Sequence, residues 1–238
     1  MRCYMRPWQG IRAISMRVVA RRALSSAERF ELYFDGGSRG NPGHSGSGAL
    51  IDHVNAGGAR VRRWEMWHYL DAHATNNVAE YSGLLLGLNA AVSIIAPSLA
   101  APLKRGDDAP DLAVRGDSML AVRQISGRYA VQATHLRGLR DEGRRLLRVW
   151  GLHPNTGAAT LDHVLRDENA AADALANVAM DERTSGERTF DARGTLLSEV
   201  TIPSGGGVDA VLLRCGAPDD SARAEAAAAA DAETIIMY

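Results

Sequence analysis

The feature that most constrains the fold of this chain is a change of hydrophobic period at Thr75. Before that residue, three segments alternate apolar and polar side chains in the manner of β-strands, at 29–35, 46–54 and 58–70. From Thr75 onward, apolar residues recur at three- and four-residue spacings until Pro97, which indicates a helix. Three consecutive strands ahead of a helix predict an antiparallel meander at the start of the domain.

Strands and helices alternate in the next part of the chain. The pattern predicts strands at 111–117 and 159–165, and helices that begin at Ser118 and cover 135–151 and 168–181. Alternation of this kind is typical of βαβ crossovers. The predicted fold class is therefore α/β, with a mixed five-stranded sheet, built from the meander and the crossovers, flanked by helices.

The pattern weakens beyond residue 182. Two segments, 195–203 and 208–215, are candidates for a hairpin around the glycine-rich stretch 204–207, and a low-complexity, alanine-rich end follows. We therefore expect one α/β domain over 28–182 and a C-terminal extension over 183–238.

Charge is distributed unevenly along the chain. Residues 1–27 contain six arginines and no acid, which predicts an organellar transit peptide, mitochondrial rather than plastid or cytoplasmic, because hydroxyl residues are few. The alternative is a disordered basic arm that touches nucleic acid. Without this segment the chain is acidic, unlike a simple nucleic-acid binder. Two cysteines without a CxxC motif disfavour a disulfide scaffold or a structural zinc site, and no apolar run is long enough to span a membrane.

Four carboxylates share one kind of position. Asp35 and Asp117 each end a predicted strand, whereas Glu80 and Asp173 lie in the first turns of predicted helices. Strand ends and the neighbouring helix ends face a common crevice in such sheets. Taken singly, each acid is typical of a solvated surface residue. Together they would repel one another unless divalent cations neutralise them, and all-oxygen ligands favour Mg²⁺ or Mn²⁺ over zinc.

Four motifs occur in order over residues 30–181: DGGSRGNPG, TNNVAEYSGLLLGL, GDSMLAVRQISGRY and HVLRDENAAADALAN. Together they resemble the type 1 ribonuclease H family. The resemblance implies the ribonuclease H fold and hydrolysis of the RNA strand of RNA/DNA hybrids to 3′-hydroxyl and 5′-phosphate ends. It also implies two Mg²⁺ ions, replaceable by Mn²⁺, held by Asp35, Glu80, Asp117 and Asp173. One ion would align and deprotonate the attacking water, and the other would stabilise the leaving oxygen.

The same resemblance implies contacts with the hybrid, including 2′-hydroxyl contacts that distinguish RNA from DNA. The positions concerned are Gly36, Asn41, Thr75, Asn76, Asn77, Ser118, Arg166 and Asn169. The asparagines of the TNN motif are equally suited to helix capping. Arg166 stands where many family members have a longer loop with a mobile histidine. It is a candidate to reach the scissile phosphate, or else an ordinary surface arginine.

The chain departs from the family pattern in having no basic insertion between helices. The segment 135–151 instead carries Arg137, Arg140, Arg144, Arg145 and Arg148, which form either a solvated face or a surface that grips phosphates. Met119 also stands where a polar residue is common.

Two other readings stay open beside an active ribonuclease H. One is a catalytically silent ribonuclease H-like module that binds nucleic acid or serves in assembly; its signature would be loss of an acid, and all four are present. The other is a nuclease of the same fold that acts on junctions or single strands, which the GNPG and TNN elements disfavour. The predicted partner is an RNA/DNA hybrid duplex, with no membrane and no obligate protein partner.

Overall fold

A computed structural model of the chain describes residues 29–95, 111–149 and 159–203. In chain order its elements are β1 (Arg29–Gly40), β2 (Gly43–Val54), β3 (Arg60–Ala74), α1 (Asn76–Ile94), β4 (Asp111–Gly116), α2 (Met119–Ile125), α3 (Thr134–Val149), β5 (Ala159–His163), the 3-10 helix η2 (Arg166–Glu168), α4 (Ala170–Glu182), β6 (Thr184–Phe190) and β7 (Leu196–Pro203). The predicted transit peptide and the strand predicted at 208–215 lie outside these described residues. Among the helices that are described, none is long and apolar enough to cross a membrane.

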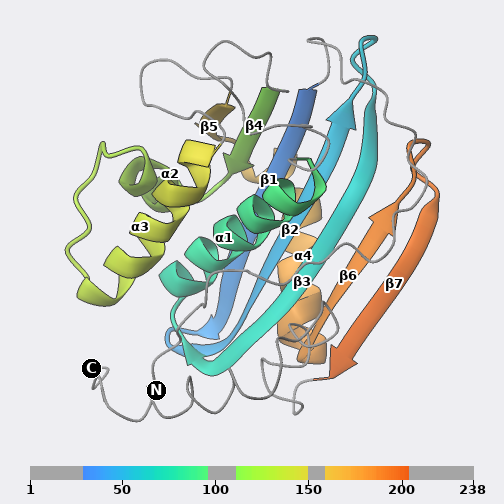
Figure 1. The fold of residues 1–238 in the computed structure, drawn as a ribbon. Coiled ribbons are helices and arrows are strands. Elements are labelled where there is room, and N and C mark those ends of the chain that lie inside the picture. Colours follow the sequence, from blue (N-terminus) through green and yellow to red (C-terminus); the bar gives the residue numbers. More distant parts are fainter. Residues whose placement is uncertain (1–28, 96–110, 150–158, 204–238) are drawn as a thin grey trace, which may run out of the picture. The chain divides into compact units, whose positions relative to one another are not determined.

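The described strands form one mixed sheet in the order β5-β4-β1-β2-β3-β6-β7 (Figure 1). β1, β2 and β3 are the predicted antiparallel meander, whereas β4 pairs parallel to β1 and β5 parallel to β4. The predicted α/β fold class is confirmed. The sheet is larger than the predicted five strands, because β6 and β7 extend it beyond β3.

These two additional strands form an antiparallel pair that the sequence pattern does not predict. β7 pairs with the preceding β6, through a turn in which Asp191 accepts hydrogen bonds from the N–H groups of Arg193 and Thr195, both at 2.8 Å. Its predicted partner strand, 208–215, lies outside the described residues, so that hairpin stays a prediction. The sequence pattern does not predict β6, because its fit in the sheet involves a side chain far away in the chain. A Cβ on Gly186 would lie 2.2 Å from the ring of Trp67, so only glycine lets the strand lie against that indole.

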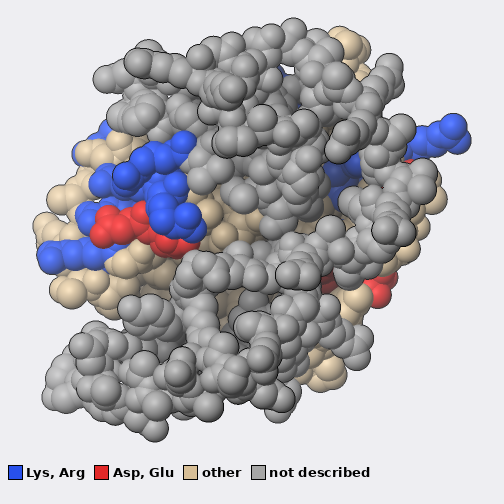
Figure 2. Space-filling view, in the orientation of Figure 1, with Lys and Arg blue, Asp and Glu red and all other residues tan. Residues whose placement is uncertain are grey.

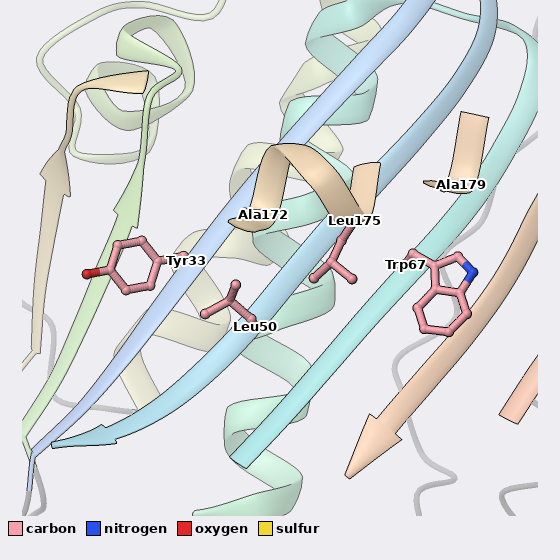
Figure 3. Close-up of a cluster of buried hydrophobic side chains, with 6 residues drawn as sticks. All are labelled: Tyr33, Leu50, Trp67, Ala172, Leu175 and Ala179. Carbon is pink, nitrogen blue, oxygen red and sulfur yellow. The ribbon is translucent and has the colours of Figure 1, made fainter. Parts of the chain in front are cut away.

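Helices cover both faces of the central strands (Figure 1). α1 packs on one face of β1 and β2, with α3 against it, and α4 packs on the other face. Beneath α4 lies a buried cluster that joins sheet to helix: Tyr33, Leu50, Trp67, Ala172, Leu175 and Ala179 (Figure 3). α4 approaches closely at Gly48, where a Cβ would come within 2.4 Å of the Ala172 carbonyl oxygen.

The helices begin largely where the sequence predicts. The Thr75 hydroxyl accepts the Val78 N–H at 3.3 Å and caps α1, and the Ser118 hydroxyl accepts the Ala121 N–H at 3.4 Å and caps α2. α4 begins at Ala170, slightly later than expected, because the preceding residues form η2. Both capped helices start directly beside the strand ends that carry the predicted acids.

Candidate active site

Asp35 and Asp117 lie side by side because their strands are parallel neighbours. Phe34 of β1 pairs with Gly116 of β4, so the next residue of each strand reaches the same edge of the sheet. Only glycine fits at position 116, because a Cβ there would lie 2.4 Å from the Phe34 ring. Asp35 is 6% exposed, and its Oδ1 accepts the Gly36 N–H at 2.8 Å. Strand pairing thereby places the two residues side by side.

α1 brings Glu80 to the same place through a contact of backbone on backbone. A Cβ on Gly36 would lie 2.1 Å from the Ala79 carbonyl carbon, and one on Gly83 would lie 2.2 Å from the Asp35 carbonyl oxygen. These two glycines let the helix rest on β1 at the level of Asp35. The Glu80 carboxylate is buried, and its Oε2 has no hydrogen-bond partner among the described residues.

Asp35, Glu80 and Asp117 each offer one carboxylate oxygen, and these oxygens lie within 4.8 Å of one another. Burial first, and then the charge of Asp117, raises the pKa of Asp35 to about 7. Burial, followed by the charges of Asp35 and Asp117, raises the pKa of Glu80 to about 9, against smaller opposing effects of Arg166 and Asn76. Close, buried acids with an unpaired oxygen suit a divalent cation with oxygen ligands, so the donor set fits Mg²⁺ or Mn²⁺.

Asp173, the fourth predicted acid, lies in the first turn of α4 with its side chain 31% exposed. It is close enough to Asp35 to raise the pKa of that carboxyl group further. Its Oδ1 accepts from Arg166 at 3.2 Å, and its Oδ2 accepts from the Asn177 amide at 2.7 Å. The structure therefore brings all four acids together, with Asp173 on the more exposed side.

Several predicted substrate contacts already have structural partners. The Asn41 side-chain oxygen accepts the backbone N–H of Asn76 at 3.1 Å, which ties the glycine-rich loop to the start of α1. Thr75 and Ser118 are the helix caps described above, and Gly36 lies beneath α1. Asn77 is exposed. These positions surround the acids, and their contacts with a hybrid stay predictions.

Asn169, predicted to contact the substrate, has partners inside the protein, and its contact with a hybrid stays a prediction. The residue is 1% exposed, and its amide nitrogen donates to the Phe34 carbonyl at 2.9 Å and to Asp117 Oδ1 at 2.8 Å. It therefore lies behind Asp117 and holds that carboxylate against β1. A motif position cannot reveal this, because the partners of the side chain, Phe34 and Asp117, lie far away in the chain.

The arginine face predicted on α3 is not a free positive surface. Arg144 donates to the carbonyls of Gln124 and Ile125, at 3.0 and 2.8 Å, so it closes the end of α2. Arg140 and Arg145 pair with acids of their own helix, Asp141 and Glu142. Figure 2 shows basic and acidic side chains together on the left of the molecule, where Figure 1 places α3. This mixed surface has less positive charge to offer phosphates than the sequence suggests.

The sheet combines an antiparallel meander with parallel strands, and four acids converge where β1, β4, α1 and α4 meet. This arrangement is that of the ribonuclease H-like class of α/β proteins. Comparison with known proteins shows which members of this class the chain is similar to. No family model matches the chain. Ribonuclease HI of Halobacterium salinarum is 36% identical over 164 residues, which are 65% of this chain and 65% of that protein.

Solved structures of ribonuclease H proteins are also similar to the chain. The N-terminal ribonuclease H domain of a Mycobacterium tuberculosis protein is 35% identical, with 64% of this chain and 94% of that chain covered and a TM-score of 0.49. LC11 ribonuclease H1, isolated from compost and solved with an RNA/DNA hybrid, is 29% identical, with 65% and 99% covered and a TM-score of 0.47. In sequence, the chain is thus similar to type 1 ribonuclease H proteins. It spans 65% of the length of the halobacterial relative and 34% of the full mycobacterial protein.

Proposed function

We propose that this protein is a metal-dependent endoribonuclease that hydrolyses the RNA strand of RNA/DNA hybrids, leaving 3′-hydroxyl and 5′-phosphate ends. The observation that carries the proposal is the convergence of Asp35, Glu80 and Asp117, whose carboxylate oxygens lie within 4.8 Å of one another. The 36% identity to ribonuclease HI of Halobacterium salinarum supports it. The complex of LC11 ribonuclease H1 with an RNA/DNA hybrid supports the same class of substrate for this chain.

The cofactor that we propose is Mg²⁺, as two ions, with Mn²⁺ as a substitute. Asp35, Glu80, Asp117 and Asp173 would hold the ions, and the unpaired Oε2 of Glu80 is an oxygen that a metal would satisfy. When bound, such ions lower the pKa of a water nucleophile and neutralise charge on the phosphate being attacked. Burial, and then repulsion between the acids, raises the pKa values of Asp35 and Glu80 in the free protein, and bound cations would remove the repulsion.

The chain itself contributes orientation. Asn169 restrains Asp117 from behind, and the Gly36 N–H holds one oxygen of Asp35, so both carboxylates meet a ligand in a set direction. Arg166 is 80% exposed and pairs with Asp173 at the open side of the site. It is therefore placed to exchange this carboxylate for a phosphate oxygen of the substrate, in keeping with its predicted role.

Cleavage of a hybrid with a labelled RNA strand tests the proposal. The intact chain should cut this strand with Mg²⁺ or Mn²⁺ but not with chelator, and should leave duplex RNA and single-stranded RNA uncut. Asp117→Asn should lower the rate by at least 100-fold with little change in melting temperature, because the substitution removes a charge and keeps the shape. Asp162→Asn, which changes an exposed carboxylate on β5, is the matched control and should cut normally.

The same experiment separates the alternative of a silent binding module. A folded wild-type protein that binds the hybrid and leaves it intact with either metal would support the silent module and contradict the nuclease. Undiminished cutting by Asp117→Asn would instead show that the acids are not the metal site.

A further inference from the structure

The carboxylate of Asp173 is held differently from the other three acids. Its two known partners are Arg166, a cation whose side chain is 80% exposed, and Asn177, a neutral amide one helical turn further along α4. A metal ion would compete with the guanidinium for the carboxylate, since both are cations. The contact from Asn177 can persist beside a metal, because it occupies one lone pair of Oδ2 and carries no charge.

Asn177 is itself oriented by a residue from another part of the chain. Its side-chain oxygen accepts a hydrogen bond from a terminal nitrogen of Arg39 at 2.9 Å. An amide has a donor end and an acceptor end, whereas a guanidinium can only donate. Arg39 therefore turns the Asn177 carbonyl toward itself, and the amide nitrogen is left facing Asp173 at 2.7 Å.

Arg39 is anchored in turn by Asp181, which accepts from its Nε at 3.1 Å and from its terminal nitrogen at 2.8 Å. Asp173, Asn177 and Asp181 follow one another at four-residue intervals, so they lie along one side of α4. Arg39 belongs to β1, four residues after Asp35. These hydrogen bonds thus link α4, which carries Asp173, to β1, which carries Asp35.

We propose that Arg39 and Asn177 are positioning residues for the metal site: Arg39 sets the direction of the Asn177 amide, and Asn177 holds Asp173 in the orientation that binds metal. This inference rests on the proposed function, because it takes Asp173 as a metal ligand. Neither residue follows from the motifs of the sequence. Four-residue spacing from Asp173 is the one sequence signal for Asn177, and it cannot show the contact with Arg39.

The test is calorimetric titration of Mn²⁺ into the intact chain without nucleic acid, for the wild type and three variants. Asn177→Ala should raise the dissociation constant for at least one Mn²⁺ about tenfold, at the low end for loss of a residue that supports a ligand. Arg39→Ala should raise it about threefold, since an unrestrained amide still donates part of the time. The double variant should resemble Asn177→Ala alone, because Arg39 acts through Asn177.

Arg193→Ala is the matched control: it removes one exposed arginine from the β6–β7 turn and should leave Mn²⁺ binding unchanged. Melting temperatures in chelator check that all variants are folded. The inference would be overturned if Asn177→Ala bound Mn²⁺ with wild-type affinity. It would also be overturned if the loss of affinity in the double variant equalled the product of the losses in the two single variants. A wild type that binds no Mn²⁺ would overturn it as well.

Hybrid cleavage, measured on the same proteins, separates this inference from the proposed function. Variants that cut as fast as the wild type at saturating Mg²⁺, but need more Mg²⁺ to reach half of that rate, would support both. A wild type that binds Mn²⁺ and cuts no hybrid would contradict the nuclease, while the shifts in Mn²⁺ affinity would still decide the roles of Arg39 and Asn177.

Discussion

Gly83→Ala tests whether direct backbone contact between α1 and β1 positions the acids. The added methyl group would lie 2.2 Å from the Asp35 carbonyl oxygen and 3.0 Å from its carbonyl carbon, whereas ordinary contacts begin near 3.4 Å. Both partners are backbone, so no side-chain rotation relieves the clash. The helix must move away from the strand by about 1 Å, which is the difference between the 2.2 Å separation from the Asp35 oxygen and an ordinary contact of about 3.4 Å.

Glu80 lies on the same turn of α1 and would move with it, away from Asp35. A displacement of about 1 Å in a catalytic group costs on the order of 100-fold in rate. Overpacking destabilises by about 1–3 kcal/mol, and replacing glycine by alanine inside a helix returns about 1 kcal/mol. We therefore expect a hybrid-cleavage rate about 100-fold lower and a free energy of unfolding lower by at most about 2 kcal/mol.

Single-turnover cleavage at saturating Mg²⁺ gives the rate, and urea unfolding gives the stability. Gly138→Ala in α3 is the matched control, because a Cβ there meets no heavy atom within 4 Å. It should gain up to about 1 kcal/mol of stability and cut at the wild-type rate. A Gly83→Ala protein that cuts within threefold of wild type at unchanged stability would refute the role given to the backbone contact.

Two further predictions concern stability away from the acids. Gly186→Ala should lower the free energy of unfolding by about 1–3 kcal/mol and change tryptophan fluorescence, because its methyl group would lie 2.2 Å from the Trp67 ring; unchanged fluorescence and stability would argue against this packing. Burial lowers the pKa of His68 to about 4, below its unfolded value, so the neutral ring favours the fold above about pH 6.5 and this stability is lost as pH falls toward 4. In His68→Gln, the free energy of unfolding measured with urea should therefore fall less between pH 6.5 and 4 than in the wild type, by at most about 3 kcal/mol. An equal fall in the two proteins would contradict this account.

Much of the fold and the identity of the four acids could be predicted from the sequence. Strands that end in Asp35 and Asp117, and a capped helix that begins at Thr75, are local patterns set by neighbouring residues. Alternation and helical spacing depend on which face of an element is buried, so they predict element type and approximate bounds. Motif order added the resemblance to type 1 ribonuclease H, and the relatives found by comparison are proteins of that kind.

Other features were hidden because their causes lie far away in the chain. β6 pairs with β3, and its Gly186 fits against the distant Trp67, whereas its own residues carry little strand signal. Asn169 turns inward because Asp117 and the Phe34 carbonyl are there to receive it. The same holds for the arginines of α3, whose partners are chosen by the end of α2 and by acids of their own helix.

The sequence by itself determined most of the elements and the identity of the four acids, because these follow from short-range spacing and residue type; its motifs added the resemblance to a family. Only the tertiary structure decided that Asp35 and Asp117 are neighbours, that glycines seat Glu80 beside them, and that Arg39 reaches Asn177. The physical reason is that strand order and close packing join residues far apart in the chain. Hydrogen bonds and pKa shifts depend on those separations in space, and separations along the chain do not reveal them.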